Sequence, residues 1–153
     1  MEKRLTYYDM AENDYEFLKE DYANGRVGNI ICYSAQNICE RYLKHIIDVY
    51  CTQEDTTTAL RTHNIRVLRS FIQTRFADFK CDWNKVLLVN GYYYDARYPG
   101  EDALIATRED VDICWQAVEE TRNAVKTYLV GHPFQQSVVN DEIMQILKKK
   151  TEL

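Results

Sequence analysis

Apolar residues recur along this chain every three or four positions, which is the spacing of one face of an α-helix. The alternation of apolar and polar residues that is typical of a half-buried strand is nearly absent. Residues 52–61 carry threonines and acidic groups and are expected to form a loop. The pattern predicts about five helices: residues 6–24, residues 27–51, a shorter helix capped by Thr62, residues 82–94, and a long helix after Thr107 that ends at Gly131-His132-Pro133.

The second predicted helix has the widest apolar face, which should pack against more than one neighbour. Its stripe consists of Ile31, Ala35, Ile38, Tyr42, Ile46 and Val49, widened by Cys39, Leu43, Ile47 and Tyr50. Further along, residues 134–153 are expected to form a short sixth helix, with Val139, Ile143, Ile146 and Leu147 on one side and Lys148-Lys149-Lys150 at its end. These elements predict an all-α protein: one up-and-down helical bundle over residues 1–133, with residues 134–153 as a helical tail packed on the bundle or extending from it.

The composition favours a globular protein that uses neither a metal nor a disulfide to hold its core. Hydrophobic residues make up 46% and charged residues 28% of the 153 positions. The net charge of −5 argues against bulk nonspecific binding of nucleic acid, but it leaves room for a local basic pocket. Five dispersed cysteines without a C-x-x-C pair fit free thiols in a reducing compartment. With no signal peptide and no apolar run long enough for a membrane span, we expect a cytoplasmic protein.

The segment from Tyr93 to Gly100 is the first candidate for chemistry. A helical pattern stops there at a Pro-Gly break, and Arg97 lies among Tyr94, Asp95 and Tyr98. An arginine offers a rigid fork of donors that suits phosphate or carboxylate, and the flanking rings can stack on a base. The simpler interpretation is a helix end at which Arg97 closes a salt bridge and the tyrosines fill the core.

A second candidate is a polar row on the second predicted helix. Gln36, Glu40 and Lys44 recur every four residues and therefore share one face. An exposed Glu40–Lys44 ion pair would explain two of them without any function. His63 lies beside the Thr62 cap, and neither it nor another histidine has the spacing of a metal ligand. We find no phosphate loop, no Ser/His/Asp signature and no indication of a metal or cofactor.

Three segments in this order resemble the HEPN domain, a family named for nucleotide binding in higher eukaryotes and prokaryotes. They are Gln36-x-x-x-Glu40-x-x-x-Lys44, Thr62-His63-Asn64-Ile65-x-x-Leu68 and Asp95-Ala96-Arg97-Tyr98-Pro99-Gly100. The resemblance covers about residues 6–130 and implies a helical bundle that commonly forms a homodimer. It also implies a nucleotidyltransferase partner in a two-component toxin–antitoxin system.

Some members of that family are metal-independent ribonucleases that carry a histidine four to six residues after an arginine. This sequence departs from that pattern, because no histidine follows Arg97 before His132. The leading hypothesis is therefore a noncatalytic protein that binds a nucleotide or another anionic ligand. In it, Arg97 holds a phosphate, Tyr98 or Tyr94 stacks or donates a hydrogen bond, and Lys44 supplies a second cation. His63 would orient Glu40 or Asp95.

Two alternatives remain at this point. One is a ribonuclease toxin with atypical spacing, in which folding brings Arg97 and His63 together. The other is a protein-interaction subunit without a ligand, which would bind a nucleotidyltransferase through the wide apolar stripe of the second predicted helix. The acidic net charge slightly disfavours the RNA interpretation.

Overall fold

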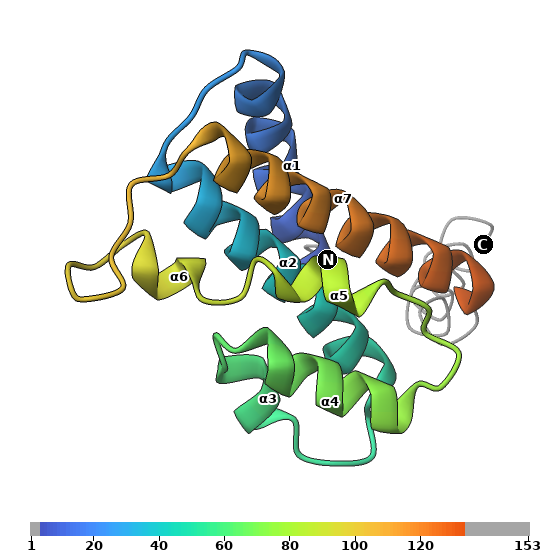
Figure 1. Ribbon diagram of the computed structural model, residues 1–153. Coiled ribbons are helices and arrows are strands. Elements are labelled where there is room, and N and C mark those ends of the chain that lie inside the picture. Colours follow the sequence, from blue (N-terminus) through green and yellow to red (C-terminus); the bar gives the residue numbers. More distant parts are fainter. Residues whose placement is uncertain (1–3, 134–153) are drawn as a thin grey trace.

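Three long helices form the frame of the protein in the computed structural model, which describes residues 4–133. They are α1 (Tyr7–Ala23), α2 (Asn29–Tyr50) and α7 (Arg108–Gly131), and α2 packs against both of the others (Figure 1). Four short helices lead back along α2: α3 (Thr57–Arg61), α4 (Ile65–Arg75), α5 (Trp83–Leu87) and α6 (Tyr92–Asp95). Residues 4–133 contain no strand, so the predicted all-α class is confirmed.

Local signals in the sequence set the ends of α1 and α7. The Thr6 and Thr107 side chains each accept a hydrogen bond from the backbone N–H three residues on. The Asp9 and Asp110 carboxylates in turn accept one from the backbone N–H of the cap residue. The predicted start of the long helix after Thr107 is confirmed. The predicted end of the long helix at Gly131 is also confirmed.

Helix α2 runs through the core. Of the predicted stripe, Ile31, Ala35, Ile38, Tyr42 and Ile46 are buried, as are Cys39, Leu43, Ile47 and Tyr50, whereas Val49 is partly exposed. Helices α1, α4 and α7 cover this face, so the expectation of several neighbours is confirmed. Because most of the stripe is buried in the protein's own core, the hypothesis that it offers a binding surface to a partner protein is wrong.

Three expectations between residues 52 and 94 are corrected by the structure. The expected loop contains α3. The cap of α4 is Asn64, whose side chain accepts from the backbone N–H of Arg66, whereas Thr62 ends α3. The helix expected over residues 82–94 is broken into α5 and α6, because Gly91 has a φ of 106°, a left-handed conformation that a continuous helix cannot contain.

All five cysteines are free. Residues 4–133 contain no group of three or more His, Cys, Asp or Glu side chains able to hold a metal ion. Among the described helices, none combines the length and the apolar character required to cross a membrane. The expected helix at Val139, Ile143, Ile146 and Leu147, its lysine run at Lys148–Lys150 and the expected tail over residues 134–153 lie outside the described residues.

Candidate functional site

Gln36 joins the three segments that build the site. Its Oε1 accepts from the backbone N–H of Gly91 at 3.0 Å and of Tyr93 at 2.7 Å, and its Nε2 donates to the backbone oxygen of His63 at 2.8 Å. The side chain is 1% exposed. Because all of these bonds go to backbone groups, Gln36 fixes the start of α6 and the α3–α4 connection against α2.

The Tyr93 ring lies between the two groups that the sequence singled out on separate segments. The His63 ring stacks on it with centroids 4.0 Å apart and planes 11° apart. The Arg97 Cζ lies 4.6 Å from the same Tyr93 centroid, and 5.3 Å from the centroids of Tyr33 and Tyr98. Aromatic faces attract a guanidinium, so these rings hold Arg97 in place while its donors stay available.

Two exposed tyrosines continue this row of rings toward solvent. Tyr94 packs edge-on to Tyr93 at 5.2 Å, and Tyr98 lies 6.2 Å from Tyr94. Tyr94 is 56% exposed and Tyr98 is 50% exposed, so neither fills the core. Arg97 is also exposed and forms no ion pair with any residue between 4 and 133, which contradicts the salt-bridge interpretation of this corner. We call His63, Tyr93, Tyr94, Arg97 and Tyr98 the Tyr93 cluster.

Behind His63, the polar row of α2 is buried rather than exposed. Glu40 is fully buried, with Oε2 3.4 Å from the His63 Nδ1 and Oε1 without a hydrogen-bond partner in the described chain. Burial raises the pKa of Glu40 against the attraction of Lys44, and burial lowers the pKa of Lys44 against the attraction of Glu40. The predicted sharing of one face is correct, but the exposed ion pair offered as its simple explanation is wrong.

A pocket of about 380 Å³ opens beside the Tyr93 cluster. We call it the amide pocket, and its lining consists of Gln36, Thr62, His63, Asn64, Asn90, Gly91 and Tyr94. The fold thus brings predicted residues from α2, the α3–α4 connection and α6 to one place. The other predicted residues are not part of this lining: Glu40, Lys44, Asp95, Arg97 and Tyr98. The backbone oxygen of Asp95 instead accepts from Leu104 at 3.1 Å and anchors the loop before α7.

Sequence reasoning missed Tyr93 as the shared contact, and it missed Asn64 and Asn90 in the pocket wall. The Asn90-Gly91 pair is a turn signal that could have located the break before α6. Nothing in the sequence relates Asn90 to Asn64, whose side chains are hydrogen-bonded at 3.2 Å.

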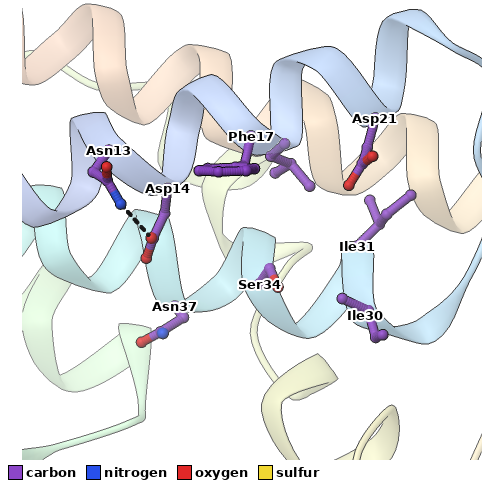
Figure 2. A pocket seen from close by; sticks show the side chains of 9 residues that line it. Asn13, Asp14, Phe17, Asp21, Ile30, Ile31, Ser34 and Asn37 are labelled. Atoms are coloured by element: carbon purple, nitrogen blue, oxygen red, sulfur yellow. Dashed lines mark hydrogen bonds between the residues drawn. The ribbon is translucent and has the colours of Figure 1, made fainter.

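A second pocket, of about 290 Å³, lies between α1 and α2 (Figure 2). The side chains of Phe17 and Ile30, 70% and 66% exposed, belong to its wall, together with those of Asp14 and Asp21. Asp14 is paired with Arg41. Apolar and acidic groups do not suit an anion, so the Tyr93 cluster and the amide pocket form the better candidate for an anionic ligand.

The chemistry available at the candidate site is binding and proton transfer. His63 is partly exposed, and contact of its Nδ1 with the Glu40 carboxylate directs the proton of a neutral ring to that nitrogen, leaving Nε2 as an acceptor. Arg97 adds a permanent positive charge on the same tyrosine ring.

Comparison with models of protein families gives a match. The family model of the HEPN domain matches residues 5–128, which is most of the chain and contains every residue of the candidate site. Neither a curated protein nor a solved structure matches significantly.

Proposed function

This chain belongs to the HEPN domain family, and on that premise we propose that it binds a nucleotide, or another small anionic ligand, at the Tyr93 cluster. One observation carries the proposal: an exposed Arg97 guanidinium is held over Tyr93 beside a pocket, without an acidic partner among residues 4–133. An arginine that is ordered by rings rather than by a carboxylate keeps its fork of donors for a ligand.

Each predicted residue has a role in this proposal. Arg97 binds the phosphate, while the exposed rings of Tyr94 and Tyr98 stack with a base. His63 supplies a second polar contact through Nε2. Four residues act on the site without lining the contact to the ligand. Gln36 acts through the backbone at Tyr93, Glu40 through His63, Lys44 through Glu40, and Asp95 through the adjoining loop.

Titration of the purified protein with a panel of nucleoside monophosphates and triphosphates tests this function, with calorimetry and thermal shift as readouts. We expect Arg97→Ala to weaken binding about tenfold or more, because a charge-assisted bond to phosphate is lost. Arg97→Lys should retain part of the affinity, since it keeps the charge but not the fork. Arg26→Ala is a matched control, because Arg26 is also exposed and pairs only weakly with Asp21 at 3.7 Å.

The proposal fails if no nucleotide binds or stabilises the protein. It also fails if Arg97→Ala and Arg26→Ala bind equally well, because the phosphate would then be held elsewhere.

Metal-independent cleavage of RNA is the second candidate function, and the arrangement of His63 and Arg97 favours it. They reach the same Tyr93 ring from different segments. In such a reaction the His63 Nε2 takes the proton of a 2′-hydroxyl, whose oxygen attacks phosphorus. The bond from phosphorus to the 5′-oxygen breaks, the 5′-oxygen takes a proton from water, and Arg97 stabilises the charge on phosphate. Glu40 would hold the protonated ring.

Incubation of RNA with the protein in the presence of a chelator decides between binding alone and cleavage. Cleavage that is lost in both His63→Ala and Arg97→Ala would establish the second candidate. Cleavage unaffected by either substitution would come from a contaminant or from another site. Binding of nucleotides without cleavage leaves the noncatalytic function.

Partners form a separate proposal that rests on the family. We propose a homodimer, and a nucleotidyltransferase partner within a two-component toxin–antitoxin system. Exposed Phe17 and Ile30 at the α1–α2 pocket offer apolar surface for such a contact. Light scattering of the wild type and of Phe17→Glu tests the dimer, and copurification with the product of a neighbouring nucleotidyltransferase gene tests the partner.

We also propose a cytoplasmic location, which is supported by the five free cysteines.

A further inference from the structure

Hydrogen bonds to the backbone fix the orientation of the side chains that line the amide pocket. Three side-chain oxygens of its lining each accept from a backbone N–H. Thr62 Oγ1 accepts from Asn64 at 3.0 Å, Asn64 Oδ1 from Arg66 at 3.0 Å, and Asn90 Oδ1 from Ile65 at 2.9 Å. A backbone N–H can only donate, so these bonds fix which end of each amide is oxygen and which is nitrogen.

The amide side chains and the Thr62 hydroxyl leave donors for a ligand, and the His63 Nε2 is an acceptor in the same lining. Within the described part of the chain, Asn64 Nδ2 makes no hydrogen bond. Asn90 Nδ2 uses one hydrogen on Asn64 Oδ1 at 3.2 Å and keeps the other. The Thr62 hydroxyl keeps its hydrogen as well. The Gln36 oxygen, the remaining amide acceptor in the lining, is occupied by Gly91 and Tyr93.

One wall of the pocket is the ring of Tyr94, which is more than half exposed. A planar group can lie against this ring and direct its edge toward the amides. The volume of about 380 Å³ is ample for one base. Arg97 lies on the neighbouring ring of the same aromatic row, so that a phosphate joined to the base through a ribose falls on its side of the site.

We propose that the amide pocket selects nucleotides whose base carries a ring carbonyl, as in hypoxanthine, guanine and uracil, and disfavours adenine. Stacked on Tyr94, such a base accepts hydrogen bonds from Asn64 and Asn90 through its carbonyl oxygen. Adenine places an amino group at the equivalent position, where two donors would face each other. This inference rests on the proposed function, because it places the phosphate of the same nucleotide at Arg97.

Inosine and adenosine monophosphates provide a matched test, since they differ in the oxo or amino group at position 6 and in the proton that accompanies it. In calorimetric titrations we expect the inosine nucleotide to bind about tenfold more tightly, the effect of about one hydrogen bond gained and one donor clash avoided. The guanosine nucleotide should behave like the inosine nucleotide. Ribose 5-phosphate, which lacks a base, should bind more weakly than both.

Asn64→Asp is the informative variant, because it keeps the oxygen that caps α4 and replaces the free donor with an acceptor. Its charge weakens binding of every nucleotide, so the readout is the ratio of the two affinities, which should fall to about one or below. Asn13→Asp is the control: Asn13 is exposed at the α1–α2 pocket, and the same change of charge there should leave the ratio unchanged.

Equal affinities for the two purine nucleotides in the wild type, with binding lost in Arg97→Ala, would overturn the base selectivity and leave the proposed function standing. Ribose 5-phosphate that binds as tightly as the inosine nucleotide would also overturn it, because the base would then make no contact. If no nucleotide binds, the proposed function itself fails.

Discussion

Replacing Gln36 with leucine should loosen the candidate site and lower the stability of the whole protein. The change preserves the approximate volume of a side chain that is 1% exposed, but it removes three hydrogen bonds. At about 1 kcal/mol each, their loss costs about 3 kcal/mol of unfolding free energy. For a chain of this length that corresponds to a fall in Tm of about 6–12 °C.

A glutamate at position 36 separates these bonds. It keeps an acceptor for the N–H groups of Gly91 and Tyr93, but as a carboxylate it cannot donate to the backbone oxygen of His63. Burial and the nearby Glu40 would raise the folded-state pKa of the new carboxyl above its unfolded value. Its protonated form, which can donate to His63, is therefore favoured at low pH, and that stability is lost as the pH rises through the folded-state pKa.

Urea unfolding at about pH 4.5 and about pH 7.5 measures both effects against the wild type at the same pH. Gln36→Leu should be destabilised to a similar extent at both values, whereas Gln36→Glu should have a smaller deficit at the lower pH. The control is Asn37→Leu, because Asn37 is the next residue on α2 and its side chain makes no hydrogen bond within the described chain. Wild-type stability in Gln36→Leu, or an equal loss in Asn37→Leu, would refute this account of Gln36.

Two other predictions concern stability. Burial lowers the pKa of His45 to about 4, and neither ring nitrogen has a hydrogen-bond partner among residues 4–133. The contribution of the neutral His45 ring to the free energy of unfolding is therefore fully present above the unfolded pKa of about 6.5. It declines as the pH falls toward 4, and about 2.5 kcal/mol is lost at pH 4.5. Urea unfolding of His45→Leu should lack this part of the pH dependence, and an unchanged pH profile would contradict it. Gly91→Ala should lower the free energy of unfolding by about 1–2 kcal/mol, because Gly91 has a left-handed φ of 106°. Gly28→Ala should lower it less, because Gly28 has an extended φ of 177° and open space around the new methyl group. Equal losses in urea unfolding would argue against backbone strain at Gly91.

The long helices could be predicted because their signals are local. Thr6 and Thr107 cap α1 and α7 through residues three positions away, and the apolar spacing on α2 identifies most of the core. The short helices could not be placed in the same way. The Asn90-Gly91 turn signal marks the break before α6, but the position of that break against α2 depends on the bond from the Gly91 N–H to Gln36, 55 positions away in the sequence. A local pattern carries no record of such a bond.

In the candidate site too, residues marked by local signals could be predicted, whereas contacts between distant segments could not. Arg97, Tyr94 and Tyr98 could be singled out because a Pro-Gly corner keeps them near the surface, and they are indeed exposed. The role of Tyr93 depends on His63 reaching its ring from another segment. The orientation of the pocket amides depends on a bond between Asn90 and Ile65, 25 positions apart. These relations arise only when α2 aligns the segments, and the apolar spacing does not encode them.

The bonds from Gly91 and Tyr93 to Gln36 also determine how fast two particular amide hydrogens exchange with solvent. The first N–H groups of a helix have no partner in their own ladder and usually exchange rapidly. Here both donate to a side chain on the central helix, at 3.0 and 2.7 Å. Their exchange in deuterated water is therefore limited by separation of α6 from α2, and a bound ligand that holds the two together would slow it further. Two peaks in an amide spectrum thus report directly on the assembly of the site, even before any ligand has been identified.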